Sequence, residues 1–163
     1  MIKKVKPKTG QESVWDYPRP PRLEKTNKTL TVFFNQEVIA RTNRGYRVLE
    51  TSHPPVYYIP PDDVKMHFLT KSPRTTYCEF KGMGKYYHIK VGEKQVDDAL
   101  WYYDQPTARF EDIKYYLAFY PNLMDKCLVD NELVTPQPGG FYGGWITKDI
   151  VGPFKGSPGT WGW

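Results

Sequence analysis

A ten-residue segment, SHPPVYYIPP (52–61), constrains the fold more than any other feature of the chain. Each proline fixes its own φ, lacks a backbone donor and keeps the preceding residue out of the helical region. Two proline pairs within ten residues therefore predict a stiff, extended segment rather than a helix. The segment also holds His53 and two adjacent tyrosines, so it could serve as a fixed turn or as the wall of a pocket.

Most of the chain reads as short strands separated by turn residues. Runs rich in β-branched and aromatic residues predict strands at 29–35, 37–41, 46–50, 55–59, 76–80, 85–91, 99–103, 115–120 and 124–129. Asn35-Gln36 and Asp130-Asn131 predict hairpin turns. A short helix is expected to open at 61–64 and to end at Ser72-Pro73, with one further helical turn at 110–114. The fold class predicted is mainly β and antiparallel, with one short helix.

The two ends differ from this central part. Residues 1–28 predict a basic, proline-rich arm, residues 29–135 a β domain, and residues 136–163 a segment of glycine, proline and aromatic residues that packs on it. A length of 163 residues suits one domain overall. Aromatic residues make up 16% of the chain, so we expect a core built largely from rings.

The charge distribution argues against a nucleic-acid partner. The net charge is +5, but Lys3, Lys4, Lys6 and Lys8 account for four of these charges and leave about +1 for the rest. Nothing resembles a secretory signal or a membrane-spanning run, so a cytoplasmic protein without a membrane partner is expected. The chain has two cysteines and no CxxC pair. We therefore expect no metal and no cofactor.

Several separate motifs together resemble one family. They are ESVWDYPRPPRLE (12–24), ETSHPPVYYIPPDDV (50–64), TYCEFKGMGKYY (76–87), ALWYYDQPT (99–107), YYLAFYPNLMDKCLVD (115–130) and PQPGGFYGGWIT (136–147). The chain resembles the domain of unknown function 427 family. That family sometimes carries a label suggesting a nucleotidyltransferase, which this sequence does not support. It has no Gly-rich loop followed by paired acidic metal ligands, which phosphoryl transfer requires.

The resemblance implies a tent-like fold with aromatic arms at both ends. In such a fold two antiparallel sheets meet at an angle and open toward one side. Related tent-like folds hold a small ligand between the sheets, and many bind zinc through CxxC pairs. Because this chain lacks those pairs, rings and hydrogen bonds would have to take the place of the metal.

Three adjacent aromatic pairs are candidates for the walls of a pocket. Successive side chains of a strand point to opposite faces. Trp101 and Tyr103 are therefore expected on one face with Tyr102 on the other, and the rings within 57–58 and 86–87 also point apart. Rings on both faces predict a core on one side and either a pocket wall or arm packing on the other.

Four polar residues could contact a ligand or act in catalysis. His53 could be a general base, a donor to a ligand, or a structural residue that fixes the corner. Cys78 could be a nucleophile or a small buried apolar residue. Lys81 lies in a turn with two glycines, where the backbone could approach an anion. Glu50 could be catalytic, although a structural pairing with Lys81 or Arg47 is favoured.

The segment GGFYGGW (139–145) is either a flap over a pocket or a fixed return segment.

The leading prediction is a small-molecule-binding domain with an aromatic pocket. Its ligand-binding residues would be His53, Tyr57, Tyr58, Cys78, Lys81, Tyr86, Trp101, Tyr103, Tyr142 and Trp145. One alternative is a metal-independent hydrolase or transferase that uses His53, Cys78 or Glu50. The other is an interaction module whose aromatic termini, including Trp15, Trp161 and Trp163, dock onto a partner protein or onto a second copy of the chain.

Overall fold

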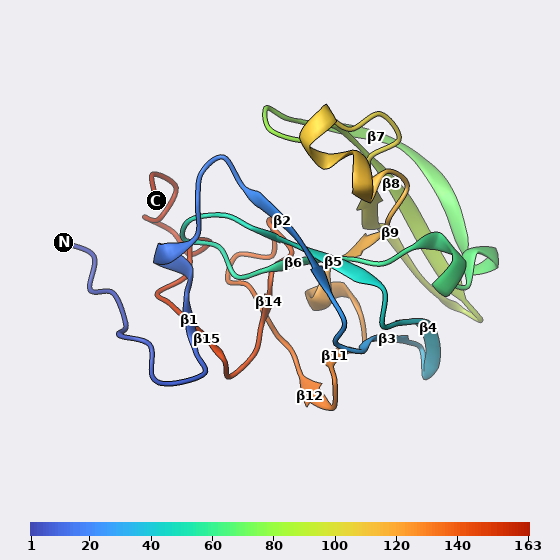
Figure 1. Cartoon of the computed structure of the whole chain (residues 1–163). Helices are drawn as coiled ribbons and strands as arrows, with labels where there is room; N and C mark the ends of the chain where they lie inside the picture. The colour runs from blue at the N-terminus through green and yellow to red at the C-terminus, as the bar shows by residue number, and fades with distance from the viewer.

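The structure is a computed structural model that describes residues 1–163 (Figure 1). It is mainly β, as predicted, and its helices are all short 3-10 turns. These turns are η1 (Val14–Asp16), η2 (Pro61–Asp63), η3 (Met66–Phe68), η4 (Ala108–Ile113) and η5 (Pro121–Leu123). The strands form several sheets, and all pairings between them are antiparallel except β1 (Glu12–Ser13) with β15 (Ile150–Val151).

Three sheets make up the body of the molecule. One has the order β10-β9-β8-β7 and consists of β7 (Leu69–Cys78), β8 (Gly82–Val91), β9 (Lys94–Tyr102) and β10 (Ala118–Phe119). The second has the order β12-β11-β3-β4, with β3 (Leu30–Phe34), β4 (Glu37–Thr42), β11 (Lys126–Val129) and β12 (Glu132–Leu133). The third has the order β2-β5-β6, with β2 (Arg22–Thr26), β5 (Gly45–Leu49) and β6 (Val56–Tyr58). A small pair joins β13 (Thr135–Pro136) to β14 (Trp145–Ile146).

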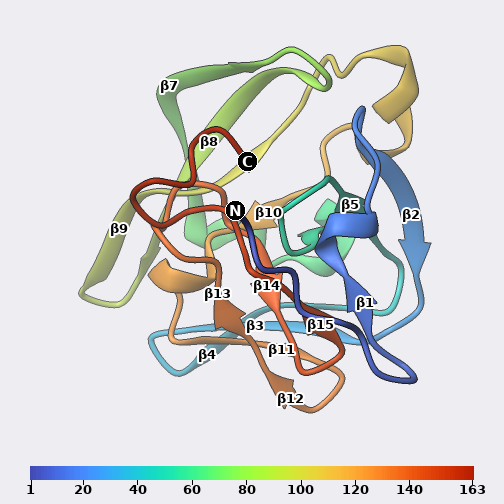
Figure 2. The same ribbon diagram turned by 90° about the vertical axis from the view of Figure 1, so that its left-hand side faces the viewer.

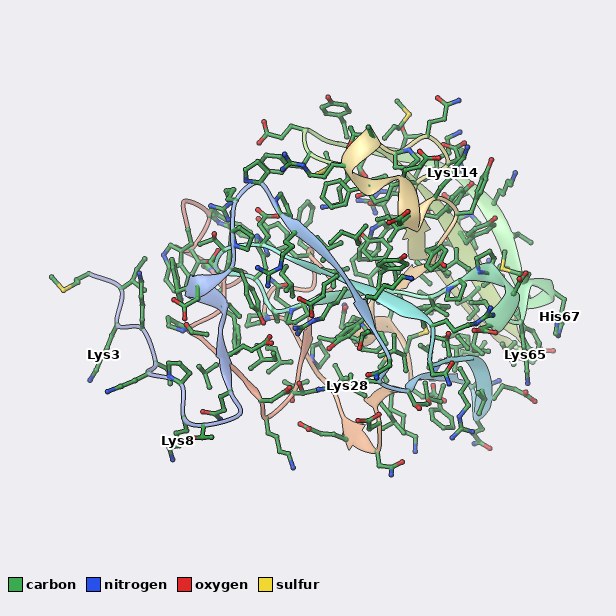
Figure 3. The ribbon with its side chains drawn as sticks, in the orientation of Figure 1. Lys3, Lys8, Lys28, Lys65, His67 and Lys114 are labelled. Atoms are coloured by element: carbon green, nitrogen blue, oxygen red, sulfur yellow. The ribbon has the colours of Figure 1, made fainter.

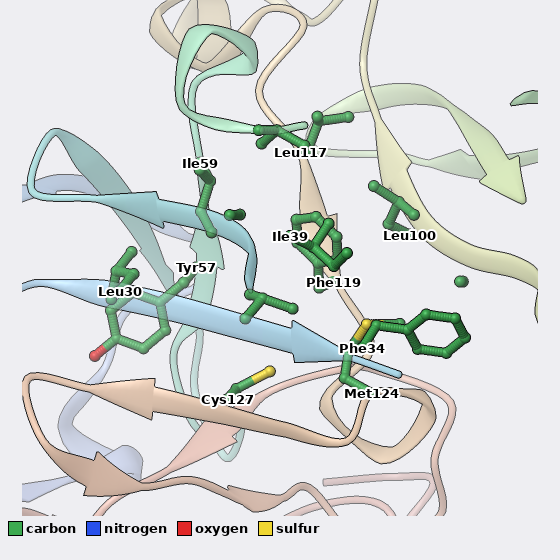
Figure 4. Packing of buried hydrophobic residues seen from close by; sticks show 14 of the residues in the cluster. Leu30, Phe34, Ile39, Tyr57, Ile59, Leu100, Leu117, Phe119, Met124 and Cys127 are labelled. Carbon is green, nitrogen blue, oxygen red and sulfur yellow. The ribbon is translucent and has the colours of Figure 1, made fainter. Parts of the chain in front are cut away.

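The largest apolar cluster lies between the first two of these sheets. β3 contributes Leu30, Val32 and Phe34, all fully buried, to a cluster that also includes residues of β8 and β9 (Figure 4). The hairpin that joins β3 to β4 turns at Asn35-Gln36, where both residues have positive φ. A two-residue turn of this kind matches the twist of the flanking strands, so the predicted hairpin is confirmed.

A second, ring-rich cluster lies on the opposite face of β8 and β9. It contains Tyr58, Tyr86, Trp101 and Tyr103 among its buried members. The neighbouring residues Tyr87 and Tyr102 turn the other way, pack on the main cluster and stack on each other with ring centroids 4.8 Å apart. The predicted alternation of adjacent rings is therefore confirmed, and it divides the β7–β10 sheet into a core face and an aromatic face.

Three local predictions need correction. The short helical segment opens at Pro61 but consists of the two turns η2 and η3, and Ser72-Pro73 lies inside β7 instead of ending a helix. The long strand predicted at 115–120 is only the two residues of β10. Residues 22–26 of the predicted irregular arm form β2, which pairs along its whole length with β5.

Both ends of the chain lie on the same side of the molecule (Figures 1 and 2). The N-terminal arm joins the C-terminal segment through the β1–β15 pair and through Trp15, whose indole N–H donates to the Pro153 carbonyl at 3.0 Å. Lys3 and Lys8 point into solvent from the first residues of the arm (Figure 3). Residues 1–8 are exposed and touch the rest of the molecule at few points, such as the bond from the Val5 N–H to the Gly152 carbonyl at 2.9 Å, and the part of the arm beyond Lys8 is packed against the body.

Candidate functional site

A cavity of about 640 Å³ opens on the aromatic face of the β7–β10 sheet, and we call it the aromatic cavity. Strands β5 and β6, strands β7 to β9 and the C-terminal segment contribute its walls. The residues that line it are Val48, Glu50, His53, Val56, Tyr58, Thr76, Tyr77, Cys78, Glu79, Phe80, Lys81, Tyr86, Trp101, Tyr103, Tyr120, Phe141, Tyr142 and Lys155. Eight of the ten residues predicted to bind a ligand are among them.

Rings from different strands meet in the wall of the cavity and are linked by hydrogen bonds. The Trp101 indole N–H donates to the Tyr58 hydroxyl at 3.3 Å, and the rings of Trp101 and Tyr120 lie 4.6 Å apart. The hydroxyls of Thr76 and Tyr86 are 3.0 Å apart. A wall held in this way is pre-formed, because each ring is fixed by a neighbour on another strand.

The phenol groups of Tyr58, Tyr103 and Tyr120 stay neutral at physiological pH. Burial is the main cause that raises the pKa of Tyr58, of Tyr103 and of Tyr120 above the ordinary value for tyrosine. Neutral phenols can both donate and accept hydrogen bonds. The wall therefore offers polar contacts without adding negative charge.

His53 is held at the corner that the proline segment predicts. Its side chain is buried, with 7% of the residue exposed, and Pro54 follows it. The preceding residue, Ser52, has φ of 72°, a left-handed conformation that is strained for any residue except glycine. The Tyr142 ring packs edge-on against the imidazole, with centroids 4.7 Å apart. The imidazole is thus fixed in position at one side of the cavity.

Gln137 determines which imidazole nitrogen of His53 carries the proton. The Gln137 side-chain oxygen accepts from the backbone N–H of Gly144 at 3.1 Å, which identifies the other atom as the amide nitrogen. That nitrogen donates to the Lys155 carbonyl at 2.8 Å and lies 3.1 Å from His53 Nδ1. Nδ1 must therefore accept, and the proton of a neutral imidazole lies on Nε2.

His53 stays neutral in this environment. Burial lowers the pKa of His53 to about 3, and the nearby cations Lys155, Arg19 and Lys81 add to this shift. With Nδ1 accepting and Nε2 protonated, the ring has no free lone pair. The imidazole can donate a hydrogen bond through Nε2, but it lacks the acceptor site that a general base needs.

Glu50 lies beside His53 and has a different partner from the one predicted. Its carboxylate oxygen is 3.7 Å from His53 Nε2 and accepts from Arg19 Nε at 3.1 Å. The predicted pairing with Lys81 or Arg47 is wrong, because Arg47 is bound by Glu12 and Glu24. Arg19 belongs to the N-terminal arm, so strand spacing alone could not have revealed it.

Two lysines of the cavity have no carboxylate within 4.0 Å, namely Lys81 and Lys155. Burial acts to lower the pKa of Lys81, yet its interaction with Cys78 and the negative charge of Glu50 act against burial, and the pKa lies above that of an ordinary lysine. Lys155 Nζ lies 5.4 Å from the centroid of the Tyr142 ring. Both ammonium groups are therefore positive charges in a ring-lined space.

Cys78 lies at the end of β7, half-buried in the cavity wall. No hydrogen bond joins its sulfur to His53. Because the imidazole of His53 also has no lone pair to accept a proton, His53 does not serve as a base for Cys78. The second cysteine, Cys127, is buried in the main core, where burial raises the pKa of its thiol.

The glycine-rich segment 139–145 passes over the mouth of the cavity. Phe141 is 60% exposed there, and Tyr142 contacts both it and His53. Gly143 has φ of 76°, and a Cβ at this position would lie 2.6 Å from the edge of the Trp101 ring. The segment is therefore seated directly on the cavity wall, and only glycine permits this approach.

Two predicted wall residues lie elsewhere. Tyr57 points away from Tyr58 into the main core (Figure 4) and also borders a separate polar cavity. Trp145 is fully buried beside Tyr57, with ring centroids 5.0 Å apart, and donates to the Phe119 carbonyl at 3.2 Å. Both rings belong to the core. For Tyr57 the cause is strand alternation, which sends one ring of the adjacent pair Tyr57-Tyr58 away from the cavity.

Sequence reasoning missed several residues of the site, chiefly Tyr120, Gln137 and Lys155. Tyr120 follows β10 and reaches the wall through its contact with Trp101. Gln137 and Lys155 come from the C-terminal segment, which crosses itself where Gly139 approaches the backbone of Gly156. The density of aromatic residues in 115–120 was a signal for Tyr120, but no local pattern pointed to the other two.

The terminal aromatic residues are largely used within the molecule. Trp15 and Trp163 pack on each other with ring centroids 5.5 Å apart. Trp161 remains 57% exposed, and its ring lies 6.4 Å from that of Tyr142 at the cavity mouth.

No helix is long and apolar enough to span a bilayer. No group of three or more His, Cys, Asp or Glu side chains is arranged to hold a metal ion.

Comparison with known proteins identifies the family. A search of curated proteins found no match to this chain. The family model described as a domain of unknown function (DUF427) matches residues 22–130, which is more than half of the chain and includes strands β2 to β11. The match contains most of the cavity wall and ends before the glycine-rich segment. The chain therefore belongs to the DUF427 family, as its sequence motifs suggested.

Proposed function

We propose that this protein binds a small organic molecule in the aromatic cavity. The observation that carries the proposal is a space of about 640 Å³ walled by rings from separate strands and provided with a few fixed polar groups. Sites for small molecules have this combination of size, apolar lining and sparse polar contacts. His53 Nε2–H and the neutral phenol groups would orient the ligand.

The tent-like arrangement expected from the family is part of this proposal. Strand β6 supplies Tyr58, and strands β8 and β9 supply Tyr86 and Trp101, so rings of two different sheets line one space. The two sheets would be the two sides of the tent, and the glycine-rich segment would close its opening. Rings and hydrogen bonds would then hold the ligand without a metal.

A variant that fills the cavity tests this proposal. Cys78→Trp places an indole in the wall, whereas Thr75→Trp adds the same group to an exposed position of the same strand. The probe is 2-naphthamide, a neutral planar molecule, and its binding is measured by isothermal titration calorimetry. We expect the wild type and Thr75→Trp to bind it and Cys78→Trp to lose binding at least tenfold (about 1.4 kcal/mol).

Circular dichroism and thermal unfolding of both variants separate lost binding from lost folding. Unchanged affinity in a folded Cys78→Trp protein would overturn the proposal, because the cavity would then not be the binding site. The proposal also falls if the wild type binds neither 2-naphthamide nor the carboxylate of the same shape, 2-naphthoate.

A further inference from the structure

We propose that the ligand of the aromatic cavity is a planar aromatic carboxylate whose acidic group is held by Lys81 and Lys155. This inference rests on the proposed function and adds the chemical class of the ligand to it. Three features of the cavity carry it: two ammonium groups without carboxylate partners, neutral hydrogen-bond donors, and rings on several sides.

The two lysines differ from the other partly buried cations of the molecule. Lys85 is paired with Asp104 at 2.6 Å, and Lys28 with Asp149 at 3.2 Å. Neither Lys81 nor Lys155 has such a partner, although both border a ring-lined space. A cation removed from water without a counter-ion is costly. An anionic ligand would supply the missing counter-ion to both groups at once.

The acidic residues of the cavity form no ion pair with either lysine, although Glu50 lies near enough to Lys81 to raise its pKa. Glu50 is bound by Arg19 of the N-terminal arm at 3.1 Å. Glu79 is exposed at the edge of the cavity and forms no ion pair. These two carboxylates would repel a ligand with several negative charges. A monoanion therefore fits the charges of the site better than a phosphate-rich molecule.

The remaining polar groups are suited to an acceptor on the ligand. His53 presents Nε2–H, because Gln137 occupies Nδ1. Trp101, Tyr103 and Tyr120 add flat surfaces on which an aromatic ring can stack. A planar aromatic molecule with a carboxylate at one end could stack its ring on these side chains and pair its carboxylate with the two lysines.

Two probes of the same shape test the class of ligand, namely 2-naphthoate and its neutral amide, 2-naphthamide. Binding of each to the full chain is measured by isothermal titration calorimetry at pH 7.5. We expect the wild type to bind the carboxylate at least about tenfold more tightly than the amide. Lys81→Gln and Lys155→Gln should each weaken carboxylate binding about three- to tenfold and leave amide binding unchanged. Lys71→Gln, a control on an exposed lysine of β7, should change neither.

The outcomes separate this inference from the proposed function. Equal affinity for the two probes would overturn the carboxylate inference and leave the proposed function standing. Absence of binding by both probes would overturn both. If Lys71→Gln weakened carboxylate binding as much as the cavity variants do, the preference for the carboxylate over the amide would come from the overall charge of the protein. The inference would then be overturned. Thermal unfolding of each variant confirms that the proteins compared are folded.

Discussion

At the scale of single residues, the imidazole of His53 shows how burial and hydrogen bonding set a protonation state. Gln137 fixes the tautomer, and three nearby cations oppose protonation in addition to burial. The sequence predicted that His53 would be held at a stiff corner. It could not predict the tautomer, because the residue that fixes it lies 84 positions away along the chain.

The neutral state of His53 predicts how stability depends on pH. The pKa of His53 is about 3 in the folded protein and about 6.5 in an unfolded chain, so the unfolded state binds more protons between these values. The stabilisation is complete above pH 6.5 and is lost as the pH falls toward 3. We expect this residue to remove about 2 kcal/mol of unfolding free energy between pH 7 and pH 5.

Urea denaturation at pH 7 and pH 5 measures this loss. His53→Asn retains an acceptor for Gln137 but does not titrate, so its loss between the two pH values should be smaller by that amount. His67→Asn, at an exposed position, serves as the control and should behave as the wild type. Identical pH dependence in wild type and His53→Asn would contradict a buried neutral imidazole.

At the scale of elements, strands were predictable where alternation was local and undisturbed. Ser72-Pro73 looked like the end of a helix, yet it lies in β7, an edge strand whose pairing shifts register between Lys71 and Thr75. Proline is tolerated at edges and bulges, so its presence did not end the strand. The run 115–120 is ring-rich, but Tyr115 has positive φ, and strand pairing is confined to Ala118 and Phe119.

The glycine-rich segment yields a prediction about packing. Gly143→Ala would place a methyl group against the Trp101 ring in a left-handed backbone conformation. Gly159 has a similar φ of 88°, and no atom lies within 4 Å of the place that an added methyl group would take. The variant Gly159→Ala therefore measures the cost of backbone strain without a steric clash. We expect Gly143→Ala to lose about 1–3 kcal/mol more unfolding free energy than Gly159→Ala.

Denaturation followed by circular dichroism provides this comparison, and tryptophan fluorescence of the folded proteins reports the displacement of Trp101. An equal cost in the two variants would show that the segment can move away from the wall without loss of stability. It would then act as a flap rather than as a fixed part of the cavity.

At the scale of the whole molecule, the N-terminal arm supports the loop that carries His53. The backbone N–H of Ser52 donates to the Val14 carbonyl at 3.0 Å, and that of Thr51 donates to the Pro18 carbonyl at 3.2 Å. Val14 is fully buried. The sequence predicted that the aromatic residues of the arm would dock on the body, but these long-range backbone contacts leave no local pattern to detect.

Two deletions separate the packed and solvent-exposed parts of the arm. Removing residues 1–8 takes away exposed side chains and two backbone hydrogen bonds, from Val5 to Gly152 and from Gln11 to Lys8, so we expect the unfolding free energy to change by less than about 2 kcal/mol. Removing residues 1–17 also removes buried Val14 and Tyr17, and we expect a loss of more than about 3 kcal/mol. Urea denaturation checks both, and equal stability of the two shortened chains would contradict a supporting role for the arm.

The boundary of the family match shows how the proposed recognition of a ligand would be divided along the chain. Most wall rings precede residue 130, whereas Gln137, Tyr142 and Lys155 follow it. Residues 22–130 thus supply most of the chamber, and the residues after the match supply one charge and the group that orients the imidazole. A chain with the same chamber and an exchanged tail could select a different molecule without any change to its sheets.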